Sequence, residues 1–400
     1  MQRAAMCPRS VECPSVKSIC LSVALAVAPL ASFAQLSSTK TLDIYFIDVE
    51  GGQSTLLILP EGQTLLVDAG YPGSGRLDAR PGDPTKARDP QRILAVTKLA
   101  GVSRIDYLLV THYHADHVGG VPELAQLIPI QTFIDHGPVN EVAARVTGTL
   151  TMYQAYAAVP ANGGHLEPKP GEQLPLSGAD TTIVSSAGAT LATSLVGARS
   201  GRNSACTPAG LAAQEATENP QSLGFLLQFG EFRFLDVGDL TGAPLFRLAC
   251  PSDHIGPVDV YLVAHHGGTD AADPSLFAAV KPRVAILNNG PLKGGAPETL
   301  NALHALQGTE TWQLHRSEIA GAVNSALAQI ANLDDTTSNW IRIRASADGS
   351  FVVLNHRTGA IKRYPPHYRS PSPTVMPARL WQLSKSMGKK QWQHGLKRTP

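Results

Sequence analysis

The chain has 400 residues, of which 43% are hydrophobic and 16% are charged, and its formal net charge at pH 7 is +1. This length permits one large or two ordinary domains, and the composition is that of an ordinary globular chain. A net charge so close to zero gives no overall electrostatic footprint for nucleic acid, and it fits a soluble enzyme.

The first 34 residues predict a secretory signal peptide. Three basic residues, Arg3, Arg9 and Lys17, precede an apolar run over 19–30, and the run Ala-Ser-Phe-Ala at 31–34 suits cleavage by a signal peptidase. The apolar run of about 12 residues is too short to cross the hydrocarbon core of a bilayer. We therefore expect an exported protein, periplasmic or extracellular, with no integral membrane segment after cleavage.

Only two cysteines, Cys206 and Cys250, lie outside this leader, which contains the other three. An oxidising compartment permits a disulfide between them. Separation along the sequence does not determine the distance between their Cα atoms, so paired and unpaired states both remain open.

Apolar runs in the first part of the mature chain predict the strands of a mixed or antiparallel sheet. Turn-forming segments rich in Gly connect them. The predicted strands cover residues 42–47, 54–59 and 64–67, and a polar loop over 71–89 leads to a helix over 91–99 and a strand over 105–110.

The run that follows this strand, Thr-His-Tyr-His-Ala-Asp-His-Val-Gly-Gly at 111–120, contains four metal-ligand side chains. With 13 His in 400 residues, three His at these offsets are expected by chance only about 0.01 times. Imidazole and carboxylate suit Zn²⁺, with Mn²⁺ and Fe²⁺ as alternatives. If the chain turns into a helix here, His112 and His114 face one point while Asp116 and His117 face a second, which predicts two metals in one pocket.

The second half of the chain repeats the theme of strands and helices. A strand over 130–135 precedes it, and predicted strands at 223–229, 232–235, 258–263 and 283–287 alternate with helices at 274–280 and 297–306. Two β-rich halves with helices outside predict an α/β protein with an αββα sandwich of two mixed sheets, and the site is expected at their shared edge.

Two segments do not fit this pattern. Residues 187–221, rich in Ala, Gly, Ser and Thr, predict a long loop or lid, with a disordered insertion as the alternative. The last 35 residues, 366–400, contain seven Lys or Arg and no acidic residue, which predicts a solvated tail, with a contact to phosphate-bearing polymers as the alternative. Residues 35–365 are then expected to form one domain.

The motif His-x-His-x-Asp-His after a strand resembles the signature of the metallo-β-lactamase fold superfamily. Three more motifs occur in the order of that superfamily: a strand that ends at Asp68, a strand that ends in Gly238-Asp239, and a strand that leads into His-His-Gly at 265–267. The resemblance spans residues 41–355 and implies the αββα fold, two divalent metals and hydrolysis by a metal-bound hydroxide.

The subgroup is similar to the hydrolase domain of the bacterial competence family of DNA-uptake channels and to its free-standing exported relatives. This similarity rests on residues 48–53, on Asn-Pro-Gln-Ser-Leu at 219–223 and on the His-His-Gly motif. Glu50, Gly51 and Gln53 stand where that subgroup has Gly, Gln and Asp.

The third His ligand of the superfamily has no clear counterpart in this chain. The metal held by His112 and His114 is then expected to have fewer protein ligands and to bind weakly. Asn219, Glu218 and His136 are the candidate substitutes, although a structural role is the default interpretation of a lone His and applies to His136, His165 and His315.

The resemblance implies a role for each site residue. His112 and His114 bind one metal. Asp116, His117 and His266 bind the other, and Asp239 bridges the two. The predicted catalytic residues are Asp116, Asp239 and His265. For His265 two roles remain open: it exchanges roles with His266, or it donates a proton to the leaving group. Asp68 is expected to brace the ligand loop and Asp236 to be structural.

Three functions of different class follow. The leading hypothesis is a phosphodiesterase or nuclease-like hydrolase, and nucleic acid is among its candidate substrates. The second is hydrolysis of a carbon substrate such as a β-lactam, lactone or thioester, against which the missing third His counts. The third is a non-catalytic metal-binding or ligand-binding module. Arg145 is the only Lys or Arg between 112 and 148, which counts against a nuclease. The oligomeric state is not predicted.

Overall fold

The computed structural model describes residues 40–366, except 77, 141–147, 161–162 and 208–215. The predicted leader and all but the first residue of the predicted basic tail lie outside the described residues. Among the helices in the described part of the chain, none combines the length and the apolar character that crossing a bilayer requires.

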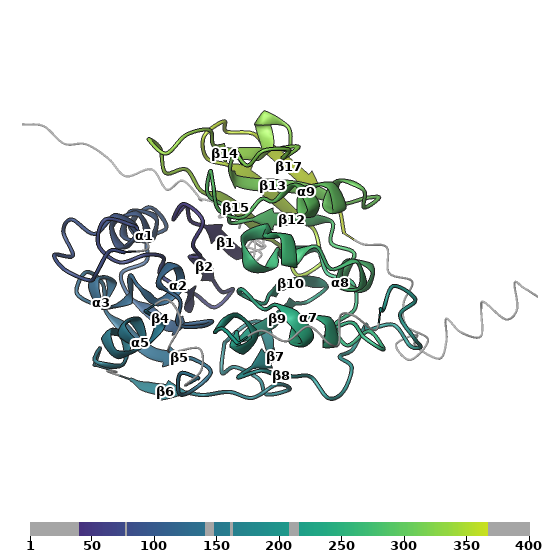
Figure 1. The fold of residues 1–400 in the computed structure, drawn as a ribbon, viewed down its shortest axis with the longest axis horizontal. Coiled ribbons are helices and arrows are strands. Elements are labelled where there is room, and N and C mark those ends of the chain that lie inside the picture. The colour runs from purple at the N-terminus through teal and green to yellow at the C-terminus, as the bar shows by residue number, and fades with distance from the viewer. Residues whose placement is uncertain (1–39, 77, 141–147, 161–162, 208–215, 367–400) are drawn as a thin grey trace, which may run out of the picture. The chain divides into compact units, whose positions relative to one another are not determined.

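Two mixed β-sheets face each other in the described part of the chain (Figure 1). The first contains, in spatial order, β17 (Ile361–Tyr364), β16 (Phe351–Asn355), β15 (Ile341–Ala345), β1 (Leu42–Phe46), β2 (Thr55–Ile58), β3 (Thr64–Val67), β4 (Ile105–Leu109), β5 (Ile130–Ile134) and β6 (Gly164–Leu166). The second contains β14 (Ile330–Asn332), β13 (Glu310–His315), β12 (Val284–Leu287), β11 (Val260–Leu262), β10 (Phe232–Asp236), β9 (Gly224–Phe229), β7 (Asp180–Ser186) and β8 (Ala189–Thr190).

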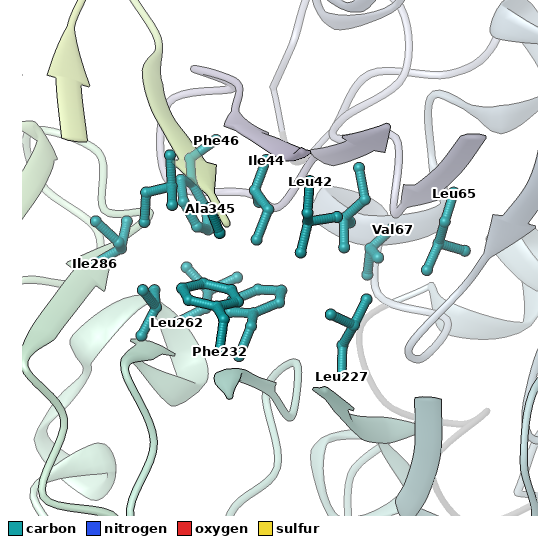
Figure 2. Close-up of a cluster of buried hydrophobic side chains, with 14 of the residues drawn as sticks. Leu42, Ile44, Phe46, Leu65, Val67, Leu227, Phe232, Leu262, Ile286 and Ala345 are labelled. Atoms are coloured by element: carbon teal, nitrogen blue, oxygen red, sulfur yellow. The ribbon is translucent and has the colours of Figure 1, made fainter. Parts of the chain in front are cut away.

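The main core lies between the two sheets, because side chains alternate between the faces of a strand. In β1, Leu42, Ile44 and Phe46 point into the space between the sheets, where Figure 2 shows them opposite Phe232 and Leu227 of the second sheet. Burial of these apolar side chains on both inner faces holds the two sheets together.

Helices cover the outer faces of both sheets. Those over the first sheet are α1 (Arg88–Leu99), α2 (Ala115–Val118), α3 (Val121–Leu124) and α5 (Thr149–Ala157), and those over the second are α7 (Gly242–Arg247), α8 (Pro274–Val280) and α9 (Pro297–His304) (Figure 1). Each set encloses a separate apolar cluster against its own sheet. The predicted αββα sandwich is therefore confirmed.

The strands and helices predicted from local patterns are present, with ends that differ by at most three residues. Two features differ from the prediction. Local sequence patterns did not predict α3, α5, α7, β6 to β8 or β13 to β17. The chain also does not divide into one sheet per half, because β15 to β17 return to the first sheet, where β15 pairs antiparallel with β1. That pairing joins segments about 300 residues apart, which local periodicity does not reveal.

The described part of 187–221 is a loop that is hydrogen-bonded to the body of the protein. The amide of Leu195 donates to the carbonyl of His254, and the amide of Asn203 donates to the carbonyl of Pro251. Nearby, Cys206 and Cys250 form a disulfide across 44 residues of sequence, so the paired state left open by the sequence is the one present. The predicted long loop is therefore present in the described part of 187–221.

We expect this disulfide to stabilise the fold, because it closes a long loop in the unfolded chain. The double variant Cys206→Ser/Cys250→Ser should lose about 2–4 kcal/mol of the free energy of unfolding in a urea titration followed by circular dichroism. Ser204→Ala, in the same loop, serves as the matched control. If the reduced wild-type protein and the double variant unfold at the same urea concentration as the oxidised wild type, the expectation is wrong.

Candidate metal centre

The predicted ligands come together because the strands that precede them end at the same edge. Parallel strands β3 and β4 of the first sheet lead to Asp68 and to the run that contains His112. Parallel strands β10 and β11 of the second sheet lead to Asp239 and His266. The carboxyl ends of parallel strands are where sites assemble in α/β sheets. Here both sheets contribute such ends to one point.

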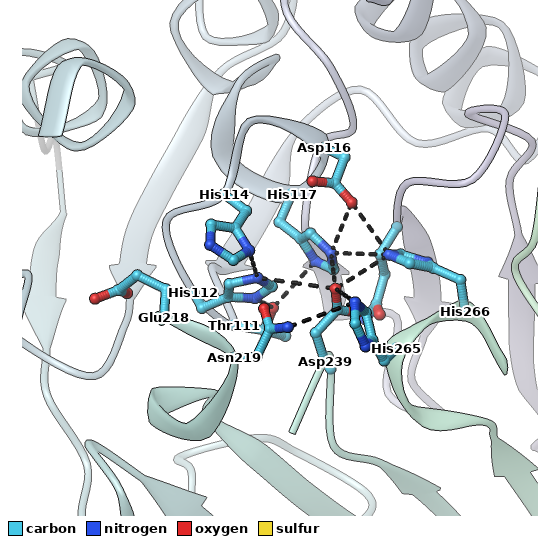
Figure 3. Close-up of polar contacts among 12 residues, drawn as sticks. Thr111, His112, His114, Asp116, His117, Glu218, Asn219, Asp239, His265 and His266 are labelled. Carbon is cyan, nitrogen blue, oxygen red and sulfur yellow. Dashed lines mark hydrogen bonds and ion pairs between the residues drawn. The ribbon is translucent and has the colours of Figure 1, made fainter. Parts of the chain in front are cut away.

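Four buried side chains converge most closely: Asp116, His117, Asp239 and His266. Nε2 of His117 lies 3.2 Å from Oδ2 of Asp116 and 3.1 Å from Oδ2 of Asp239. Nε2 of His266 lies 3.1 Å and 3.2 Å from the same two oxygens. Figure 3 shows the two imidazoles and the two carboxylates facing one another.

His112 and His114 lie beside this group, as the spacing of the motif predicted. Nε2 of His112 is 3.0 Å from Nδ1 of His114 and 3.9 Å from Oδ2 of Asp239 (Figure 3). Burial, together with the positive charges of His117 and His114, lowers the pKa of His112 well below its ordinary value. A neutral imidazole is the form that binds a metal. Because Oδ2 of Asp239 also lies 3.1 Å from Nε2 of His117, this carboxylate stands between the pair His112 and His114 and the four-residue group.

Asn219 is the candidate substitute for the missing His that the structure brings to the centre. Its Nδ2 lies 3.4 Å from Nε2 of His265, and Figure 3 shows its amide close to His112. Glu218 and His136 instead pair with each other, with 2.9 Å between Oε2 and Nε2. Figure 3 shows Glu218 pointing away from the imidazoles. Those two candidates are therefore engaged elsewhere.

His265 and His266 occupy an unusual backbone conformation. Their φ angles are 48° and 54°, in the left-handed region that residues other than Gly rarely adopt. Nε2 of His265 lies 3.8 Å from Oδ2 of Asp239, and its Nδ1 lies 2.9 Å from Asp270. Burial acts to lower the pKa of His265, but the negative charges of Asp239 and Asp270 outweigh it and raise the pKa to about 9. His265 is thus a cationic imidazole at the edge of the centre.

Asp68 has the contacts of the predicted brace. Its carboxylate accepts hydrogen bonds from the amide of Thr111 at 2.8 Å and from the Thr111 hydroxyl at 2.7 Å. Nδ1 of His117 lies 2.7 Å from Oδ2 of Asp68, which leaves Nε2 of His117 directed at the centre. A carboxylate behind a ligand His orients the ring and raises its basicity.

Asp236 lies off the centre, as its position on the strand predicted. It accepts hydrogen bonds from the side chain of Gln53 and from the amide of Gly238. Burial raises its pKa to about 7. The backbone amide of Gln53 donates to the backbone carbonyl of Asp116 at 3.0 Å, and a Cβ added at Gly52 would collide with that carbonyl. The loop 50–53 therefore forms a closely packed wall of the site.

Lys293 is a residue of the site that no sequence motif predicted. Its ammonium contacts Oδ2 of Asp116 and lies 3.2 Å from the hydroxyl of Tyr71, and its side chain is 34% exposed. The loop that carries it is fixed to a ligand, because the amide of Gly295 donates to the carbonyl of His266 at 2.9 Å. The sequence feature that could have pointed to it was the turn segment Pro-Leu-Lys-Gly-Gly at 291–295, which follows β12, a strand that also ends at this edge.

The donor set fits a divalent metal. Burial raises the pKa of Asp116, but the charges of Lys293 and His117 outweigh it and lower the pKa well below its ordinary value. Burial acts to lower the pKa of His117, but the negative charges of Asp239, Asp116 and Asp68 outweigh it and raise the pKa well above its ordinary value. Within the described residues, Oδ1 of Asp239 and Nδ1 of His266 are buried without a hydrogen-bond partner. Carboxylate and imidazole donors that converge in this way are suited to a divalent cation.

The two remaining lone histidines lie outside this centre. Nε2 of His315 is 2.7 Å from Oδ1 of Asp48, and both side chains are buried. Nε2 of His165 is 2.7 Å from Oδ2 of Asp135. The structural interpretation of His315 therefore agrees with its contacts, and His165 belongs to a different group of residues.

Comparison with known proteins agrees with the fold. Residues 48–190 match the family model described as the Metallo-beta-lactamase superfamily, and the predicted superfamily is thereby confirmed. The "Lactamase-like protein nscB" of Aspergillus fumigatus is 34% identical over 106 residues, 26% of this chain and 30% of that protein. The protein of the same name from Neosartorya fischeri is 34% identical over 99 residues, 25% of this chain and 29% of that protein. The chain thus spans about a third of the length of these curated relatives.

Solved structures with a related fold have low sequence identity to this chain. A mutant of the CmlA beta-hydroxylase has a TM-score of 0.40 and 18% identity, with coverage of 68% of this chain and 52% of that chain. The metallo-beta-lactamase fold protein YhfI from Bacillus subtilis has a TM-score of 0.39 and 11% identity, with coverage of 68% and 96%. The similarity to the competence family is not among these findings.

The brace leads to a prediction about metal affinity. Asp68→Asn keeps the size of the side chain but removes the charge that faces Nδ1 of His117, and the loss of such a partner weakens metal binding by about 10- to 100-fold. Titration of the protein with Zn²⁺ against a chromophoric chelator measures the change. Asp43→Asn, which alters a carboxylate paired with Arg344 away from the centre, is the matched control. Equal affinities of the two variants would contradict the assigned role of Asp68.

Proposed function

We propose that this chain, a member of the metallo-beta-lactamase superfamily, is an exported metal-dependent hydrolase that acts on phosphodiesters. Asp116, His117 and His266 would hold one divalent cation, and His112 and His114 a second, with Asp239 shared between them. Such cations supply Lewis acidity, which activates water at neutral pH and stabilises negative charge on the substrate. Zinc is the expected metal, with manganese or iron as alternatives.

The position of Lys293 carries the choice of substrate. A lysine ammonium that is one-third exposed and in contact with Asp116 places a fixed positive charge at the mouth of the centre. Charge-assisted contacts of this kind favour a substrate that is negatively charged at or beside the scissile bond. A phosphodiester carries its negative charge on the non-bridging oxygens of the reacting phosphorus, whereas a lactone or a thioester is uncharged at the scissile bond. Lys293 also lies 3.2 Å from Tyr71, so the ammonium is held in place before a substrate arrives.

His265 is suited to protonate the leaving group. It is 27% exposed, it lies 3.8 Å from Asp239, and its pKa of about 9 keeps the ring protonated at neutral pH. An alkoxide that leaves a phosphodiester needs a proton, and a positioned imidazolium can supply it. Asp270 behind Nδ1 keeps Nε2 directed toward the centre.

Export is supported by two independent observations. The first 34 residues have the pattern of a signal peptide, and Cys206 and Cys250 form a disulfide. Disulfides persist in oxidising compartments and are rare in the cytosol. The proposal therefore places the enzyme in the periplasm or outside the cell.

The first test is hydrolysis of bis(p-nitrophenyl) phosphate by the mature protein reconstituted with Zn²⁺ or Mn²⁺. We expect turnover that EDTA abolishes and that His114→Ala lowers by about 100-fold or more, because the variant removes a ligand. His304→Ala, which changes an exposed histidine on α9, should retain full activity. Absence of turnover with either metal would overturn the phosphodiesterase proposal and favour a carbon-centred substrate or a binding role.

A second test concerns Lys293. Lys293→Met should raise KM for bis(p-nitrophenyl) phosphate by about tenfold more than it does for the uncharged ester p-nitrophenyl acetate, because only the diester carries a charge for the ammonium to bind. Lys293→Arg, which keeps the charge, should restore most of the affinity. Metal content measured on each variant separates this effect from a change at Asp116. An equal loss for both substrates would show that Lys293 does not select for the anion.

A further inference from the structure

A cavity of about 370 Å³ lies beside the metal centre, outside the ligand set. Its wall is aromatic and is formed by Tyr113, Phe133, Tyr153 and Tyr156. Tyr113 stands between His112 and His114 in the sequence, so the cavity and the metal-binding run share this residue. A pocket of this size with an apolar wall and a few polar groups has the features of a small-molecule site.

The rings of the wall pack against one another and present a continuous surface. The centroids of Tyr113 and Tyr153 are 4.7 Å apart, those of Tyr113 and Tyr156 are 5.9 Å apart, and those of Phe133 and Tyr156 are 5.8 Å apart. Tyr113 and Tyr156 are buried, whereas Tyr153 is partly exposed. The wall is therefore preformed, and Tyr153 is its most accessible ring.

The polar side of the cavity is acidic. Asp135 and Glu167 line it together with His165, whose Nε2 is 2.7 Å from Asp135 and whose Nδ1 is 3.8 Å from Glu167. Among the described residues that line the cavity, none is Lys or Arg. Burial and the negative charge of Asp135 raise the pKa of Tyr153, so the phenol stays neutral. Two carboxylates and one imidazole thus form the polar side of the cavity, and neutral rings form the rest of its wall.

We propose that this cavity binds an organic ammonium ion, with its cationic head against the faces of Tyr153 and its neighbours and its charge toward the exposed carboxylate of Glu167. Aromatic faces attract cations through their quadrupole, and this attraction recurs in sites for quaternary ammonium ligands. The proposal stands independently of the proposed hydrolase activity, because it concerns a binding site formed by other side chains.

An inorganic metal ion is the competing occupant, because Asp135, His165 and Glu167 also have ligand atoms close to one another. The hydrogen bonds of Asp135 argue against it. The carboxylate of Asp135 already accepts from the amide of Gly137 at 2.8 Å, from the hydroxyl of Tyr156 at 2.6 Å and from the side chain of His165 at 2.7 Å. Both oxygens of Asp135 and Nε2 of His165 are thus already engaged within the protein, which leaves Glu167 as the carboxylate with few contacts.

The test uses choline and its uncharged isostere, 3,3-dimethylbutan-1-ol, as probes in calorimetric titrations of the full-length mature protein. We expect choline to bind at least about tenfold more tightly than the isostere, because only the cation gains from the aromatic faces and the carboxylates. Tyr153→Leu should weaken choline binding by about fivefold, whereas Tyr153→Phe, which keeps the ring, should not. Glu167→Gln should reduce the preference for choline over the isostere.

Tyr107→Leu is the matched control, because Tyr107 is a partly buried tyrosine on β4 that does not line the cavity. Circular dichroism of each variant confirms that it is folded. Equal affinity for choline and its isostere would overturn the proposal in favour of an apolar pocket. Absence of choline binding would overturn it as well, and binding of Zn²⁺ that is lost in His165→Ala without any binding of choline would assign the cavity to a metal.

Discussion

The need to balance three buried carboxylates governs the structure of the metal centre. Asp68, Asp116 and Asp239 all lie within a region closed to water, where an uncompensated charge costs several kcal/mol. His117 lies against all three, and Lys293 supplies a further positive charge at Asp116. Lys293 lies at the edge of the centre, whereas the oxygens of Asp116 and Asp239 face the imidazoles of His117 and His266, so these donors are placed to share a cation.

Closely packed loops hold the side chains of this centre in place. The loop 50–53 lies so close to Asp116 that a Cβ at Gly52 would collide with the Asp116 carbonyl, and one at Gly294 would collide with His266. His265 and His266 accept a left-handed backbone, which costs of order 1–3 kcal/mol for each residue. These contacts immobilise the ligands from both sheets at once, so the ligands are held in position before any metal or substrate binds.

Local patterns in the sequence predicted the parts of the site that are local in structure. The run 111–120 contains four ligands within six residues and follows a recognisable strand, so its chemistry could be identified without knowing any distant contact. Lys293 could not be identified in this way, because it lies 177 residues from Asp116 and a single lysine beside two glycines has no distinctive spacing. The same reason hid β15 to β17, which join the first sheet through the pairing of β15 with β1. It also hid the cavity, whose wall combines β5, α5 and the metal-binding run.

In the proposed two-metal centre, the absence of the third His would give the two positions different chemistry. One position is surrounded by two imidazoles and two carboxylates whose ligand atoms already lie within hydrogen-bonding distance of one another. The other would be formed by His112 and His114 with Asp239, which lies 3.9 Å from His112. Asn219, whose amide contacts His265, is the candidate that would stand there in place of an imidazole. An amide is a weaker and harder ligand than an imidazole, and it shifts preference from zinc toward oxygen-preferring ions such as manganese. Occupancy of the two positions should therefore differ, with the His117 position filled first.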